Sequence, residues 1–82
     1  MTKSFRKPPE DARVLLARNV LRLRLALGQS QEGLAELAGF HRTYVSQVER
    51  RVANVTLDNI QRLAVVLDVP VAELFATETG PS

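Results

Sequence analysis

The sequence predicts a small all-α domain built from five helices. Three observations support this fold class. Apolar residues recur at helical spacing, residue types that begin and end helices flank each apolar run, and we find no convincing strand-like alternation. The chain has 82 residues. A domain of this size buries only about 60% of its unfolded surface, so we expect association with a second chain to add stability.

The first helix is expected over residues 10–27. It follows the pair Pro8 and Pro9, which breaks a helix, and it precedes Gly28, which is a typical helix end. Its apolar face consists of Leu16, Val20, Leu23 and Leu27.

Two shorter helices are expected over residues 31–38 and 42–50. Ser30 and His41 are placed to cap their first turns, and Gly39 ends the earlier one. The side chains expected to be buried are Leu34, Leu37 and Ala38 in the earlier helix and Val45 and Val48 in the later one.

Two further helices complete the domain, which we expect to span residues 10–76. Thr56 is a suitable cap for the fourth helix, and Pro70 stands at the favoured first position of the fifth. The fifth helix runs through Phe75, and residues 77–82 are read as a polar tail. The apolar stripe of the fourth helix is Leu57, Ile60, Leu63, Ala64 and Leu67.

Charge is distributed unevenly along the chain, although the net charge is only +2. Residues 1–30 have seven basic residues and two acids, residues 31–54 have three of each, and residues 55–82 have one basic residue and four acids. A basic amino-terminal part suits a polyanionic partner, while a solvated surface would give a similar count. Residues 1–9 are read as a flexible basic arm.

Composition excludes several function classes. The absence of cysteine rules out disulfides and thiolate metal sites, and a single histidine provides no nucleophile–base or metal constellation. We therefore expect no enzyme activity, cofactor or metal. The sequence has no apolar run of membrane-spanning length and no signal peptide, which indicates a cytoplasmic protein.

Residues 31–50 have the spacing of two helices joined by a tight turn. Ala35 is small where the helices approach closely, Gly39 accepts a positive φ, and Val45 anchors the second helix to the core. These constraints leave an outward polar face near the start of the second helix, the part that enters a DNA major groove in helix-turn-helix proteins. The face consists of Arg42, Thr43, Tyr44, Ser46 and Gln47.

The string GQSQEGLAELAGFHRTYVSQVERRVANVTLDNIQRLAVVLDVPVAELF resembles the XRE or lambda-repressor-like (Cro-type) helix-turn-helix regulators. Within that family, RTYVSQVERRVANVTLDNI is most similar to the small controller proteins of restriction–modification systems. The resemblance implies a compact lambda-repressor-like fold and a homodimer that regulates transcription from a palindromic DNA operator. It also makes RNA polymerase a candidate partner.

The resemblance gives roles to individual residues. Gln31 corresponds to a phosphate-contacting glutamine, and Asn54 to a contact with the DNA backbone. Arg42, Thr43 and Gln47 correspond to readers of base edges or phosphates, which agrees with the chemistry of these side chains. The alternative for each is a solvated polar residue on a helix or in a turn. For Tyr44, packing on the core edge and a phosphate contact are compatible.

Arg24 falls on the apolar arc of the first helix, where a guanidinium needs a partner. Glu49 is the expected one, and the family has a similar pair; the alternative is that Arg24 extends its head group to water. Two departures from the family are Arg51, which is expected to adopt a left-handed conformation, and Ala53, which lacks a basic side chain.

Surplus apolar residues predict a surface for association. Leu21, Leu25, Val65 and Val71 lie off the arcs that face the core. The candidate dimer interface consists of Val65, Val66, Val69, Val71 and Phe75. The same surplus supports an alternative function on the same fold, a protein-interaction module such as an antitoxin subunit or a bridging adaptor.

Overall fold

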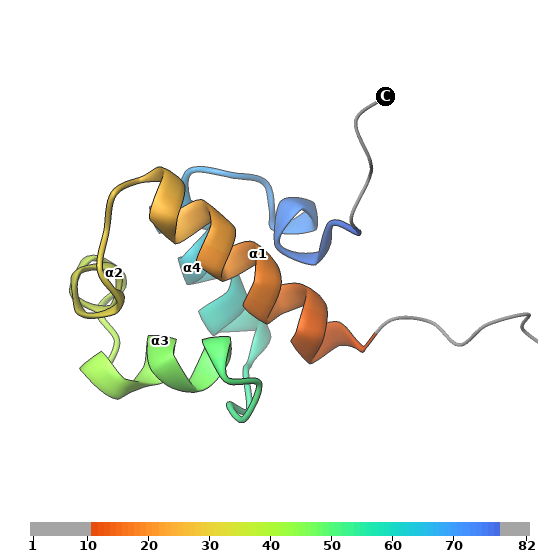
Figure 1. Ribbon diagram of the computed structural model, residues 1–82, viewed down its shortest axis with the longest axis horizontal. Helices are drawn as coiled ribbons and strands as arrows, with labels where there is room; N and C mark the ends of the chain where they lie inside the picture. Colours follow the sequence, from red (N-terminus) through yellow and green to blue (C-terminus); the bar gives the residue numbers. More distant parts are fainter. Residues whose placement is uncertain (1–10, 78–82) are drawn as a thin grey trace, which may run out of the picture.

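The computed structural model describes residues 11–77, which form four α-helices and one short 3-10 helix (Figure 1). In order they are α1 (Ala12–Ala26), α2 (Gln31–Ala38), α3 (Arg42–Glu49), α4 (Leu57–Leu67) and the 3-10 helix η1 (Val71–Phe75). No strand occurs within the described residues. The expected all-α fold class is therefore confirmed. The expectations for the arm, residues 1–9, and for most of the tail lie outside the described part of the chain.

The helices pack around α1, which runs across the length of the molecule (Figure 1). It packs against α3 on one side and against η1 on the other, while α2 contacts both α3 and α4. The α2–α3 pair thus forms one end of the molecule, with α3 along its edge. This arrangement holds α3 against a scaffold and leaves its far face open.

One core joins all five helical elements. Each contributes one of the five largest side chains that are less than 2% exposed: Val20, Leu34, Val45, Leu63 and Leu74. Burying a side chain of this size stabilises a fold by about 1.5 to 3 kcal/mol. The position of α3 is therefore fixed by the same core that holds the whole domain.

Side-chain caps begin each of the four α-helices. Ser30, His41 and Thr56 accept hydrogen bonds from backbone N–H groups in their helices, as the sequence predicted. The fourth cap, Asp11, accepts from the backbone N–H of Arg13. Each cap satisfies a donor that the first helical turn leaves unpaired.

Several predicted helix boundaries are wrong by one or two residues. The first helix begins at Ala12 because Asp11 is extended, with ψ 129°, and acts as the cap. The last element is a 3-10 helix and not an α-helix, and it begins after Pro70, whose ψ of 153° is extended. The third helix ends at Glu49, since Arg50 is its C-cap.

Three leucines expected in the core are exposed instead: Leu27, Leu37 and Leu57 are 46%, 59% and 82% accessible. Leu27 is the C-cap of α1, and Leu57 is the first residue of α4, so both lie where their helix leaves the core. The side of α2 that carries Leu34 and Ala38 faces its neighbours, and Leu37 lies outside that arc.

Candidate nucleic-acid interface

The α2–α3 unit has the backbone that a tight helix-to-helix turn needs. Gly39 ends α2 with φ 74° and ψ 27°, a left-handed conformation that glycine adopts without steric cost. The N–H of Phe40 returns to the carbonyl of Ala35 at 2.8 Å, which closes the end of the helix. Ala35 is 1% exposed and Val45 is fully buried, so both lie inside the core as the spacing predicted.

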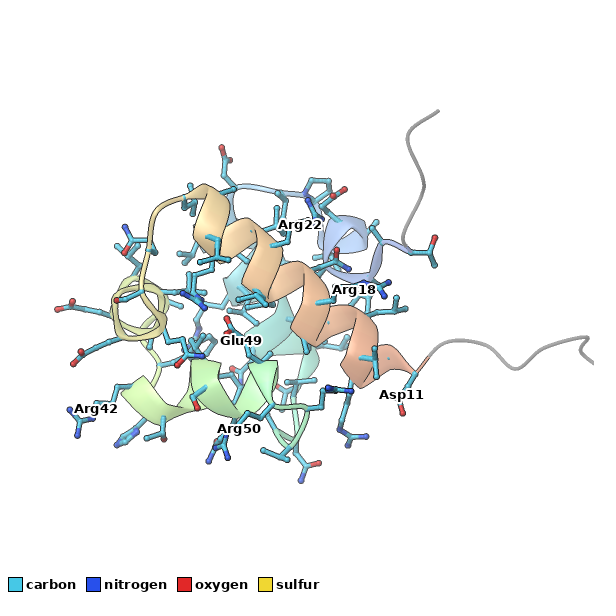
Figure 2. The ribbon with its side chains drawn as sticks, viewed as in Figure 1. Asp11, Arg18, Arg22, Arg42, Glu49 and Arg50 are labelled. Carbon is cyan, nitrogen blue, oxygen red and sulfur yellow. The ribbon has the colours of Figure 1, made fainter. Side chains whose placement is uncertain are left out.

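A buried ion pair fixes α3 relative to α1. Arg24 Nε donates to Glu49 Oε2 at 2.7 Å, and Arg24 Nη2 donates to Glu49 Oε1 at 3.0 Å. The two side chains are 11% and 8% exposed. Figure 2 shows Glu49 on the side of α3 that faces α1. Arg24 therefore pairs with Glu49 and does not extend its head group to water.

Gln31 joins this ion pair at the start of α2. Its Nε2 donates to Glu49 Oε1 at 2.8 Å, and its side chain is half-buried. Arg24 Nη1 also donates to the carbonyl of Gln29 at 2.9 Å. The three helices are thereby tied together at one point. One amide hydrogen of Gln31 remains beyond the bond to Glu49, which leaves a donor for a phosphate.

The outward face of α3 is polar and largely accessible. Arg42, Thr43 and Gln47 are exposed, whereas Ser46 is half-buried. Figure 2 shows Arg42 and Arg50 at opposite ends of α3, both pointing away from α1. The nearest acid to Arg42 is Glu32 at 3.9 Å, and this pair is more than 70% exposed on both sides. Solvent therefore weakens the pair, and the guanidinium is accessible to another anion.

Tyr44 connects this face to the core. Its ring lies 4.6 Å from that of Phe40, with the planes tilted by 49°, and the residue is half-buried. Its hydroxyl oxygen accepts from Asn59 Nδ2 at 3.2 Å. Because the oxygen is used as an acceptor, the O–H group can still donate to an anion.

Asn54 lies in the loop after α3 and is exposed. Its side-chain oxygen accepts from Arg13 Nη2 at 3.3 Å, and Arg13 Nε donates to the carbonyl of Ala53 at 3.3 Å. Sequence reasoning missed Arg13 because nothing in the chain links it to a residue 41 positions away. The sequence-based candidates also leave out Arg50, the C-cap of α3, which is exposed.

The candidate dimer residues divide into two groups. Val65 and Val71 are 67% and 36% exposed. Val66, Val69 and Phe75 are partly buried and pack against the core of their own chain. Val65 and Val71 are therefore accessible to a second chain, whereas the other three residues stabilise the core of their own chain.

The described residues lack the features of two other kinds of site. Within residues 11–77, no group of three or more side chains is arranged to hold a metal ion. In the same part of the chain, no helix has the length and apolar character needed to cross a bilayer. What the site does offer is a row of hydrogen-bond donors and positive charges along α3 and the loop that follows it.

Known proteins resemble this chain in sequence and in fold. Residues 20–74 match the HTH_3 helix-turn-helix family. A hypothetical transcription factor of Neisseria meningitidis serogroup B is 45% identical over 66 residues, which are 80% of this chain and 62% of that protein's length. The control protein C.SmaI of Serratia marcescens is 43% identical over 68 residues, or 83% of this chain and 81% of that protein.

Solved structures of controller proteins superpose on this fold. The restriction-modification controller protein C.AhdI of Aeromonas hydrophila is 48% identical with a TM-score of 0.73, over 77% of this chain and 96% of that one. The controller protein C.Esp1396I, solved as a tetramer with its natural 35 base-pair operator, has a TM-score of 0.71 at 27% identity. That match covers 82% of this chain and 88% of the other.

Proposed function

Because the chain belongs to the HTH_3 helix-turn-helix family, we propose that it is a sequence-specific, DNA-binding transcription regulator of the cytoplasm. We further propose that it acts as a homodimer on a palindromic operator, and that it serves as the controller of a restriction–modification system. If it activates transcription, RNA polymerase becomes a second partner.

The accessible face of α3 is the observation on which the proposal depends. Arg42, Thr43 and Gln47 are exposed on the outside of α3, while Val45 and Glu49 hold its inside to the rest of the domain. Arginine can form two hydrogen bonds to guanine, glutamine can form two to adenine, and the threonine methyl group can contact that of thymine. A rigidly held helix with this face fits a major groove.

Contacts to the DNA backbone would set the position of that helix. The candidates are Gln31 at the start of α2, Tyr44 through its O–H group, and Asn54 in the loop after α3. Each has a donor available after its contact inside the protein is counted. Such contacts fix the register of a protein on DNA, and the base contacts then supply specificity.

The relatives support the same assignment. C.SmaI is named a control protein, and C.Esp1396I was solved on its operator. A dimer of this chain would place two copies of α3 in successive major grooves on one side of the duplex. Its half-sites should then be centred about 10 to 11 base pairs apart, or roughly 34 Å.

Selection of bound sequences from a random DNA pool tests this function. We expect a selected site with two-fold symmetry and binding that weakens steeply as salt rises. Equal affinity for the selected and random DNA would contradict sequence-specific regulation.

One observation favours a second candidate, a protein-interaction module. Leu25 and Leu37 are 61% and 59% exposed. Exposed apolar side chains of this kind are typical of surfaces that bind a partner protein. Absence of DNA binding together with capture of a specific protein partner would favour that module over the regulator.

A further inference from the structure

Arg13 and Asn54 form a contact across the molecule at the end of the candidate DNA-binding face. Arg13 belongs to the first turn of α1, and Asn54 lies in the loop after α3. The Arg13 guanidinium bonds to the Asn54 side-chain oxygen and to the Ala53 carbonyl, both at 3.3 Å. The start of α1 and the end of α3 approach each other along one edge of the molecule (Figure 1).

The contact leaves most of the hydrogen-bonding capacity of the two side chains available. A guanidinium has five N–H donors, and two of them account for the bonds to Ala53 and Asn54. Because the Asn54 oxygen accepts from Arg13, its amide nitrogen faces elsewhere. That nitrogen donates to no other group within residues 11–77. Both side chains are exposed, so these donors face solvent at one point.

The positive charge of Arg13 is not cancelled by this contact, since both of its acceptors are neutral. The neighbouring acid, Asp11, accepts from the backbone N–H of Arg13 at 2.8 Å as the cap of α1. Arg50 and Arg51 follow α3 on the same loop and are exposed. The local balance therefore remains positive, which suits an anion with several acceptor oxygens.

We propose that Arg13 and Asn54 together bind one phosphate of the DNA backbone, with Arg13 supplying the charge and holding the Asn54 amide in position. This inference rests on the proposed function. A strand that borders the major groove passes the ends of a helix lying in that groove, where this pair is found. Arg13 from α1 thereby provides a basic group next to Ala53, a position that has no charge of its own.

The salt dependence of DNA binding tests this role. Each phosphate contact adds about 0.9 to the slope of log affinity against log salt, so a fourfold rise in salt weakens each contact by about 3.5-fold. We expect Arg13→Gln to lower the slope by about 0.9 per bound protomer and to weaken selected and random DNA by the same factor. Arg13→Lys should restore the slope because it retains the charge.

Arg22→Gln is the matched charge control. Arg22 lies on the same helix, but Figure 2 shows it far from α3, and it pairs with Glu73 at 2.8 Å. We expect the salt-dependence slope of Arg22→Gln to equal that of the wild type when both proteins bind DNA in the same oligomeric state. Thermal unfolding followed by circular dichroism establishes that each variant is folded at the assay temperature.

Two outcomes overturn the inference. If the wild type binds DNA but Arg13→Gln and Arg22→Gln have the same slope, Arg13 contacts no phosphate and the proposed function stands. If the wild type binds no DNA, the proposed function and this inference fail together. The double variant Arg13→Gln/Asn54→Ala adds a check. If the two residues bind one phosphate, the fold loss of DNA affinity in the double variant should be smaller than the product of the losses in the two single variants.

Discussion

Arg24 of α1 and Glu49 of α3 meet through two hydrogen bonds, at 2.7 and 3.0 Å, although 25 residues separate them in the chain. The same carboxylate accepts from Gln31 at the start of α2. The orientation of the candidate recognition helix thus depends on a charged group that is buried in the domain. Substitutions in this pair can therefore test both the stability of the fold and the geometry of the candidate DNA-binding face.

Glu49→Ala should strongly destabilise the protein. The substitution leaves the Arg24 guanidinium buried without its partner, and breaking a buried pair in this way costs about 3 to 5 kcal/mol. Denaturant unfolding measures the loss. Replacing both residues with leucine should recover most of the stability, because two apolar groups leave no charge unpaired. An unfolding free energy equal to the wild type for Glu49→Ala would contradict the role of the pair.

The exposed pair provides the contrast. Arg42 and Glu32 are 3.9 Å apart and more than 70% exposed, and a pair of this kind contributes at most about 1 kcal/mol. Glu32→Ala should therefore leave the unfolding free energy nearly unchanged. If Glu32→Ala lowers the free energy of unfolding as much as Glu49→Ala does, burial does not explain the difference expected between the two ion pairs.

Gly39→Val should lower stability without removing a DNA contact. Gly39 has φ 74°, and a side chain there costs about 1 to 2 kcal/mol from the backbone alone. A Cβ at this position meets no close neighbour, because the nearest atom would be Arg62 Nη1 at 3.9 Å. Valine is β-branched and is expected to cost more than alanine, while Gly39→Asn should cost least, since asparagine tolerates this conformation. Thermal melts that rank valine equal to asparagine would contradict this explanation.

Local features were well predicted from the sequence because they depend on a few adjacent residues. The caps Ser30, His41 and Thr56 and the left-handed Gly39 are of this kind. The conformation of Arg51, with φ 68°, follows equally from its place after a helix where glycine would be favoured. These positions are sufficient to locate the α2–α3 unit.

Features that depend on packing between distant segments were not predictable in the same way. Leu37 fits a helical stripe by its spacing, but its exposure depends on which side of α2 its neighbours cover. η1 has only five residues, too few for periodicity to distinguish a 3-10 helix from an α-helix. The contact between Arg13 and Asn54 requires the folded chain, and no local pattern indicates it.

Arg42→Ala and Gln47→Ala should change which DNA sequence the protein prefers. Both side chains are exposed on α3, and a residue that reads a base contributes about 1 to 3 kcal/mol of discrimination. The measurement compares the affinity of each variant for the selected site, for sites with single base changes and for random DNA. An equal loss on every sequence would assign the residue to phosphate contact instead.

We expect two copies of the chain to form a homodimer through the surface of α4 and η1. Val65 and Val71 are 67% and 36% exposed, so they have apolar surface available to a second copy. Val66, Val69 and Phe75 already pack against their own core, and they are expected to support the interface from beneath. Asn19 holds η1 in place, since its amide donates to the carbonyls of Leu74 and Ala76 at 3.1 and 2.9 Å.

Val71→Glu should weaken self-association and operator binding together. A carboxylate in an apolar contact must lose its water without gaining a partner, which disfavours the dimer. Helix content should not change, because Val71 is partly exposed in the single chain. Asp58→Ala on α4 is a control for surface substitution, since Asp58 is exposed and polar and is not in the candidate set. Sedimentation and DNA titration measure both effects. A wild-type protein that remains monomeric at micromolar concentration, both free and on its selected site, would rule out the dimer.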